Sequence, residues 1–218
     1  MIVFAREPED RDAHASLRDH VACLFEKDGW AFSLIYAVTF GGFIGLATFL
    51  PSYFYDQFGV SKIEAGQLTM LAAFMGAATR ILGGWLSDHW GGVNTLTVVL
   101  VVISGSLLLC GLSSQSLALT VICFLVCFAA LGAGNGALSQ LVPLRWPATT
   151  AVAGSMIGEL GALGGGLIPA TMGLSQQYSG SYFTGFAIFA ACALAMLAML
   201  RFMPVSYTHL RAHETRHD

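Results

Sequence analysis

An all-helical integral membrane protein with six transmembrane helices is the fold class that the sequence predicts. Of its 218 residues, 56% are hydrophobic and only 11% are charged, whereas soluble domains carry about 25% charged residues. The mean hydropathy is +0.69, and seven charged residues lie between Gly29 and Leu200. They are Asp56, Lys62, Glu64, Arg80, Asp88, Arg145 and Glu159. A helix needs about 20 apolar residues to cross a bilayer, so the length accommodates roughly six spans with short loops and no second, water-soluble domain.

The first 28 residues are polar and carry mixed charges, among them Arg6, Glu7 and Glu9. They lack the succession of basic, apolar and cleavage-site regions that defines a signal peptide. We therefore expect residues 1–28 to be a cytoplasmic linker that leads into a transmembrane bundle at residues 29–204.

Six apolar stretches follow, separated by short polar breaks. Unbroken apolar runs such as residues 96–112 exclude the alternating strands of a membrane barrel. The predicted spans, each with boundaries good to a few residues, are 30–55, 64–87, 94–112, 117–140, 148–173 and 181–203.

The orientation follows from the basic residues of the loops. Arg145 and Arg201 follow the fourth and sixth spans, and four basic residues precede the first, whereas the opposite loops carry only Lys62, offset by Asp56 and Glu64. Because basic residues favour the cytoplasmic side, we expect a multi-pass membrane protein with both termini in the cytoplasm.

Residues 205–218 (VSYTHLRAHETRHD) change abruptly to a basic, histidine-rich composition. His209, His213 and His217 would share one face of a helix, a spacing that suits a metal site. The string also resembles the translation of a sequencing adaptor, and an artefactual tail explains it without any function. We therefore predict no metal site and no cofactor, and we expect the natural sequence to diverge after about Pro204.

Glycine is concentrated in the fifth span, at Gly154, Gly158, Gly161, Gly164, Gly165 and Gly166. Each glycine inside a helix costs about 1 kcal/mol relative to alanine, so a run of six indicates a role. One role is static close packing of two helices. The other is a surface on which two helices slide or hinge, and the consecutive glycines at 164–166 favour this conformational role.

Two ionisable residues lie deep inside predicted spans. At 1.5 Å per residue, Arg80 is about 12 Å and Glu159 about 17 Å from the nearer cytoplasmic end. Such groups normally face a cavity or one another, and the planar guanidinium matches planar oxyanions with two parallel hydrogen bonds. With Tyr36 and Asn135 at similar depths, these residues indicate a solute site for an anion. The alternative is a structural Arg80–Glu159 pair.

The loop after the second span reads GGWLSDHWGG. Gly84, Asp88 and Gly91 match the G-x-x-x-D-[RK]-x-G-[RK] signature of the major facilitator superfamily, with His89 and Gly92 in place of its basic residues. Four further strings resemble the seventh, eighth, tenth and eleventh helices of the nitrate/nitrite porters of that superfamily. They span residues 39–54, 76–92, 132–143 and 153–173. Over residues 27–204 the chain therefore resembles the carboxy-terminal six-helix half of a twelve-helix carrier.

The resemblance implies a nitrate or nitrite carrier of the bacterial inner membrane. It implies that Arg80 and Tyr36 line the substrate site, to which we add Asn135, and that Gly161 and Gly164–Gly166 let the central helices move. Glu159 is left with two possible roles, proton coupling or neutralisation of Arg80.

The partners that the resemblance implies are the anion, the lipid bilayer and a missing amino-terminal half, with no nucleic acid. A carrier of another small anion or solute is the alternative. A membrane scaffold or an intramembrane enzyme has less support, because the sequence contains no HExxH or GxSxG motif and no paired carboxylates within a span, so we expect no enzymatic activity.

Overall fold

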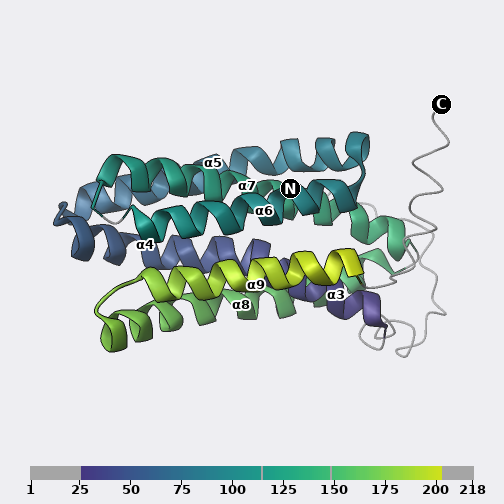
Figure 1. Cartoon of the computed structure of the whole chain (residues 1–218). Helices are drawn as coiled ribbons and strands as arrows, with labels where there is room; N and C mark the ends of the chain where they lie inside the picture. The colour runs from purple at the N-terminus through teal and green to yellow at the C-terminus, as the bar shows by residue number, and fades with distance from the viewer. Residues whose placement is uncertain (1–25, 114, 148, 203–218) are drawn as a thin grey trace, which may run out of the picture.

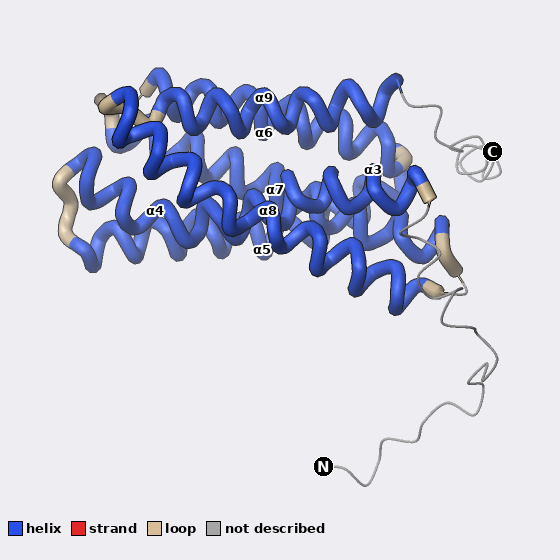
Figure 2. Tube along the Cα trace, turned by 90° about the horizontal axis from the view of Figure 1, so that it is seen from below, coloured by secondary structure: helices blue, strands red, loops and turns tan. Residues whose placement is uncertain are grey.

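The structure, a computed structural model, describes residues 26–113, 115–147 and 149–202. Within these ranges it contains no strand, and six of its helices are long and apolar enough to cross a membrane. These helices lie alongside one another in a single bundle (Figures 1 and 2). The predicted six-span helical fold is confirmed, whereas the tail 205–218 and nearly all of the linker 1–28 lie outside the described residues.

The first span is continuous from Lys27 to Phe58, but it is not a uniform α-helix. It comprises α3 (Lys27–Tyr36), a π-helical segment η1 (Ala37–Gly41) and α4 (Gly42–Phe58). The other spans are α5 (Lys62–Trp90), α6 (Gly92–Leu112), α7 (Leu117–Arg145), α8 (Thr150–Ser179) and α9 (Phe183–Phe202). Most boundaries lie within a few residues of those predicted, and the largest difference is the end of α8, at Ser179 where 173 was predicted.

Short turns connect consecutive helices at the end of the bundle that holds Glu64. The α5 helix begins with a capping box in which the Ser61 backbone N–H donates to the Glu64 carboxylate at 2.9 Å. Helices α4 and α8 stop at Gly59 and Gly180, whose φ values of 64° and 65° lie in the left-handed region that glycine adopts without strain. These signals make consecutive spans antiparallel neighbours.

Helices α5 and α7 cross with their backbones in close contact. A Cβ atom on Gly132 would overlap the carbonyl of Gly76, and one on Gly136 would overlap the carbonyl of Arg80. Thr79 also ties the two helices, because its hydroxyl donates to the Ala129 carbonyl at 2.9 Å. Small residues permit this approach, and the crossing fixes the backbone of Arg80 against α7.

Helices α5 and α8 leave much of their surface uncovered. Only 28% of the most apolar stretch of each is buried, compared with 56% in the first span. Exposed apolar side chains include Phe74 and Ile81 on α5 and Leu163 and Leu167 on α8. Apolar surface of this extent indicates contact with lipid or with another protein segment.

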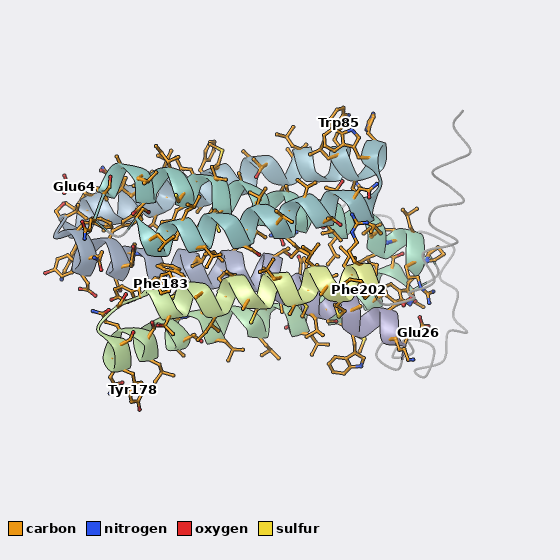
Figure 3. The ribbon with its side chains drawn as sticks, viewed as in Figure 1. Glu26, Glu64, Trp85, Tyr178, Phe183 and Phe202 are labelled. Carbon is orange, nitrogen blue, oxygen red and sulfur yellow. The ribbon has the colours of Figure 1, made fainter. Side chains whose placement is uncertain are left out.

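An ion-pair cluster closes the opposite end of the bundle, where Figure 3 places Glu26 and Phe202. The Arg145 guanidinium donates to Asp28 Oδ2 at 2.8 Å and to Glu26 Oε2 at 2.7 Å. The same guanidinium lies 5.2 Å from the Trp146 ring. The cluster joins the start of α3 to the end of α7, although these residues are more than a hundred positions apart in the chain.

We expect Arg145→Ala to lower the free energy of unfolding by about 1–3 kcal/mol, because it removes two hydrogen bonds between charged groups. Thermal unfolding in detergent measures the change. Arg145→Lys keeps the positive charge but loses the planar guanidinium that donates to both carboxylates, so the free energy of unfolding should fall by an intermediate amount. Arg201→Ala removes an exposed arginine at the same end and serves as the control. Equal stability of Arg145→Ala and Arg201→Ala would contradict a stabilising role for the cluster.

Candidate functional site

Arg80 projects from the middle of α5 and contacts the first span. Its Nη2 atom donates to the Tyr36 hydroxyl with a donor–acceptor distance of 3.4 Å, which is long for a hydrogen bond. The Arg80 side chain is exposed. Within the described part of the chain, the ion pairs are those of Arg145, so Arg80 has no carboxylate partner there. Its positive charge is available to an anion.

Tyr36 is held in place by two neighbours. Its ring stacks on Phe40, with centroids 4.9 Å apart and planes 17° from parallel. On its other flank lies Gly161 of α8, where a Cβ atom would come within 2.5 Å of Tyr36 Cδ1. A residue with a side chain at 161 would displace the ring, so glycine here makes room for the tyrosine that contacts Arg80.

The π-helical segment η1 begins immediately after Tyr36, and sequence reasoning missed it. A π-helix contains more residues per turn than an α-helix and occurs often at functional sites. In this chain it packs on α8: a Cβ on Gly41 would lie 2.6 Å from the Gly161 carbonyl oxygen. Because these neighbours are distant in the sequence, no local pattern in residues 37–41 indicates the segment.

Asn135 is buried on α7, with 3% of its surface exposed, and its Oδ1 atom forms no hydrogen bond. Helical spacing puts it on the same face as Leu138, Ser139 and Val142. These three residues line a cavity of about 190 Å³ between α3, α7 and α8. The full lining is Tyr36, Leu138, Ser139, Val142, Pro143, Thr150, Gly154 and Ile157. Tyr36 is the predicted substrate-binding residue that lines this cavity, and Asn135 lies one helical turn from Ser139.

Glu159 lies apart from this group. Glu159 precedes Gly161 by two residues, which corresponds to a rotation of about 200° around a helix. Because Gly161 faces Tyr36, Glu159 lies on a different side of α8. Its side chain is exposed. Glu159 and Arg80 form no ion pair in this structure, so the predicted layer of four polar residues is only partly assembled in the described bundle.

The six glycines of α8 divide into two sets. Gly161, Gly164 and Gly165 pack on the first span, and a Cβ on Gly164 would lie 2.8 Å from the Ala37 carbonyl oxygen. Among the described residues, Gly158 and Gly166 have no neighbour within 4 Å of such a Cβ, and Gly154 has only Val142, at 4.0 Å. The first set builds a close helix contact, whereas Gly154 lines the cavity beside Tyr36 and Gly166 is exposed.

The loop signature lies at the end of the bundle that holds Arg145, where Figure 3 shows Trp85. Gly91 has a φ of 84°, which ends α5 in a conformation that favours glycine. Gly84 is buried, and a Cβ there would lie 3.4 Å from Gln140 Nε2 of α7. Asp88 is exposed, so the described residues do not cover its carboxylate.

Comparison with known proteins identifies relatives that match most of this chain. A family model described as Major Facilitator Superfamily matches residues 2–169. The chain is 30% identical to the "Probable nitrate/nitrite antiporter NarK1" of Thermus thermophilus, over 78% of this chain and 43% of the relative. It is 30% identical to the "Nitrite extrusion protein" of Bacillus subtilis, over 80% and 44%.

A third relative is the "Probable nitrate/nitrite transporter NarK2" of Mycobacterium tuberculosis, at 32% identity over 85% of this chain and 45% of the relative. The chain therefore spans less than half the length of these curated relatives. Among solved structures, the Escherichia coli fucose:proton symporter superposes with a TM-score of 0.71 at 15% identity, over 92% of this chain and 50% of that one. This last match concerns the fold alone.

Proposed function

We propose, from the premise that this chain belongs to the Major Facilitator Superfamily, that it forms the carboxy-terminal half of a secondary carrier for nitrate or nitrite. Within the superfamily it belongs with the nitrate/nitrite porters, as the sequence predicted. The proposal concerns transport and assigns no enzymatic reaction to the chain.

The observation that carries the proposal is the environment of Arg80. A guanidinium remains protonated at any physiological pH, and a charge inside a bilayer normally faces a partner or an aqueous cavity. Here the guanidinium has the Tyr36 hydroxyl at 3.4 Å and no acidic partner in the described part of the chain. A permeant anion supplies the missing negative charge.

Nitrate is a planar anion whose three oxygens only accept hydrogen bonds. The Arg80 fork supplies two parallel donors, and the Tyr36 hydroxyl and the Asn135 amide supply further donors from α3 and α7. Positive charge and donors from three helices suit an oxyanion, and the fixed charge of Arg80 repels a cation. We therefore assign Arg80, Tyr36 and Asn135 to this half of the substrate site.

The uncovered faces of α5 and α8 support the proposal that a second six-helix half completes the carrier. In such carriers the substrate binds between two halves that rock about it. The second half would cover Gly158 and Gly166, where no described residue comes within 4 Å of an added Cβ. The proposed carrier lies in the bacterial inner membrane with the Arg145 end of the bundle in the cytoplasm, as basic loop residues favour.

A competition assay tests the substrate class. The chain is reconstituted with its amino-terminal half in proteoliposomes, and nitrate counterflow is measured against excess nitrite, chlorate or a larger carboxylate. Competition by nitrite supports the proposal. The alternative, a carrier of another small anion, shares the same Arg80 environment, and it is favoured if a larger anion competes and nitrite does not.

Glu159→Gln distinguishes the two roles proposed for this residue. If Glu159 carries a proton inward, the substitution abolishes accumulation driven by a pH gradient but retains counterflow. If it neutralises Arg80, both modes fall together, because an uncompensated buried charge costs about 3–5 kcal/mol. Since Glu159 and Arg80 do not pair in this structure, we expect the first result. Equal loss of accumulation and counterflow would contradict it.

A further inference from the structure

Thr79, the residue before Arg80 on α5, holds its hydroxyl at the contact with α7. Its Oγ1 atom lies within hydrogen-bond distance of three carbonyl oxygens: Met75 at 3.0 Å and Gly76 at 3.1 Å on its own helix, and Ala129 of α7 at 2.9 Å. A hydroxyl has one proton to donate, and a threonine within a helix usually donates it to the preceding turn. Here the shortest of the three distances crosses to the neighbouring helix.

The contact between α5 and α7 around Thr79 is formed largely by backbone atoms, and Figure 1 shows the two helices side by side. A Cβ on Gly132 of α7 would lie 2.8 Å from Thr79 Oγ1, so glycine at position 132 leaves room for the hydroxyl. About one turn further along α5, a Cβ on Gly83 would overlap the backbone of Ala133. The Thr79 hydroxyl is therefore a polar group within a contact where the two backbones otherwise meet directly.

A contact between glycines defines the axial register of two helices only weakly. Helices resist sliding when side-chain ridges on one fit into grooves on the other, and glycine has no side chain to form a ridge. A hydrogen bond, in contrast, requires a defined distance and alignment of its two atoms. Within the described residues, the bond from Thr79 to the Ala129 carbonyl is the side-chain hydrogen bond that joins α5 to α7. It is the directional interaction in this contact.

The register of α5 on α7 decides how the proposed anion-binding groups lie relative to each other. The carbonyl of Arg80 packs against Gly136, the residue after Asn135, and Arg80 Nη2 lies 3.4 Å from the Tyr36 hydroxyl. A guanidinium donates two parallel hydrogen bonds to a planar anion only when the two planes are aligned. A displacement of about 1 Å can lower a rate about a hundredfold, so a small axial shift of α5 would be enough to misplace the Arg80 guanidinium relative to Asn135.

We propose that Thr79 is a positioning residue for anion binding: its hydrogen bond to Ala129 sets the register of α5 on α7 and so places the Arg80 guanidinium relative to Asn135. Thr79 acts through Arg80 and does not itself contact the anion. The inference rests on the proposed function, because it takes a planar anion as the ligand of Arg80. The register itself can be measured separately from transport.

Thr79→Ala and Thr79→Ser isolate the hydroxyl, because these two variants differ by one oxygen atom. Each is introduced into the full carrier, with its amino-terminal half, in proteoliposomes, and the KM and maximal rate of nitrate counterflow are measured. Thr79→Ala should raise the KM about tenfold or more, as expected for a misplaced binding group, and Thr79→Ser should keep the KM close to that of the unmodified carrier. An unchanged KM in Thr79→Ala, or an equal increase in both variants, would overturn the proposal.

Thr69→Ala is the matched control on the same helix. The Thr69 hydroxyl donates to the Ala65 carbonyl at 2.8 Å, within α5, so its loss should leave the contact with α7 and the nitrate KM unchanged. A hydrogen bond between helices inside a membrane contributes little to stability on average, so Thr79→Ala and Thr69→Ala should unfold at similar temperatures. If the KM of Thr69→Ala rises as much as that of Thr79→Ala, the effect is a general one on α5, and the proposal is wrong.

A double-mutant cycle with Arg80→Lys separates positioning from a general structural role. Nitrate affinity is obtained here from the rise in unfolding temperature with nitrate concentration, which requires no transport. If Thr79 aligns the Arg80 guanidinium, Thr79→Ala should weaken nitrate binding much less in the Arg80→Lys background, where no planar group remains to be aligned. A loss of affinity by the same factor in both backgrounds would show that Thr79 acts independently of Arg80, which contradicts the proposal.

Spin labels on α5 and α7 measure the register without nitrate. Met70 and Leu144 are 67% and 60% exposed, and each is replaced by a labelled cysteine in a carrier whose Cys23 and Cys192 are replaced by serine. Electron–electron resonance should give a shifted or broadened distance distribution in Thr79→Ala and the unmodified distribution in the serine variant. An unchanged distribution in Thr79→Ala would overturn the proposal. A changed distribution in a carrier that does not bind nitrate would support the role of Thr79 in the register and contradict the proposed function instead.

Discussion

Arg80→Lys is expected to abolish most nitrate transport while leaving the carrier folded. Lysine keeps the positive charge but replaces a planar fork by a point charge, so it cannot donate two parallel hydrogen bonds to one anion. A hydrogen bond to a charged group contributes about 1.5–3 kcal/mol, and losing one should lower nitrate affinity about tenfold to a hundredfold. Nitrate binding and counterflow by the reconstituted carrier measure the change.

The matched control for this substitution is Arg201→Lys, which makes the same chemical change at an exposed position near the end of α9. It should leave nitrate affinity and counterflow unchanged. Tyr36→Phe complements both variants, because it removes the hydroxyl that lies 3.4 Å from Arg80 Nη2 and keeps the ring between Phe40 and Gly161. Uptake by Arg80→Lys close to that of the unmodified carrier would exclude Arg80 as the anion-binding group.

Gly164→Leu is expected to stop turnover with a smaller effect on the amount of folded carrier. A Cβ at this position would lie 2.8 Å from the Ala37 carbonyl oxygen, so leucine must push α8 away from η1. If these helices slide during transport, the obstruction acts on every cycle. Counterflow per folded molecule should fall more than about tenfold, as expected for a change that misplaces a site by about 1 Å. Fluorescence-detected size-exclusion chromatography quantifies the folded carrier.

Gly105→Leu is the matched control, because no residue in the described part of the chain lies within 4 Å of a Cβ on Gly105 of α6. The same glycine-to-leucine change should there have little effect on counterflow. Gly164→Ala adds only one methyl group and should give an intermediate rate. If Gly164→Leu loses folded protein and counterflow in equal proportion, the contact between α8 and η1 is static packing and not a moving surface.

Much of the fold could be predicted from the sequence because the membrane imposes a simple length rule on apolar segments. The third span ends at Leu112 and the fourth begins at Leu117, where both boundaries were predicted. The largest difference, at the end of α8, arises from a polar last turn: residues 175–179 are SQQYS, and hydropathy does not distinguish such a turn from a loop.

Features that depend on contacts between distant segments could not be predicted. The π-helical segment η1 rests on the glycines of α8 more than a hundred positions away, and the bonds from Arg145 to Glu26 and Asp28 cross a similar distance. Loop charge indicated the side of the membrane for Arg145, but it contained no information about a partner.

The candidate site was partly predictable for a similar reason. Composition identifies the few polar residues inside apolar spans, and depth groups them in one layer, so Arg80 and Tyr36 could be expected to meet. Rotation around the helix axis is harder to infer in α8, where glycines occupy several faces. Glu159 therefore fell in the predicted layer, although its side chain lies about 200° around the helix from Gly161.

Nitrate counterflow with separated halves tests the central claim most directly. This six-helix chain and its amino-terminal half are expressed as two polypeptides, and each is reconstituted in proteoliposomes alone and together. The account predicts saturable nitrate counterflow only when both halves are present, and its loss when the chain carries Arg80→Lys. Counterflow by this chain alone, or none with both halves folded and associated, would contradict the claim that it is half of a nitrate carrier.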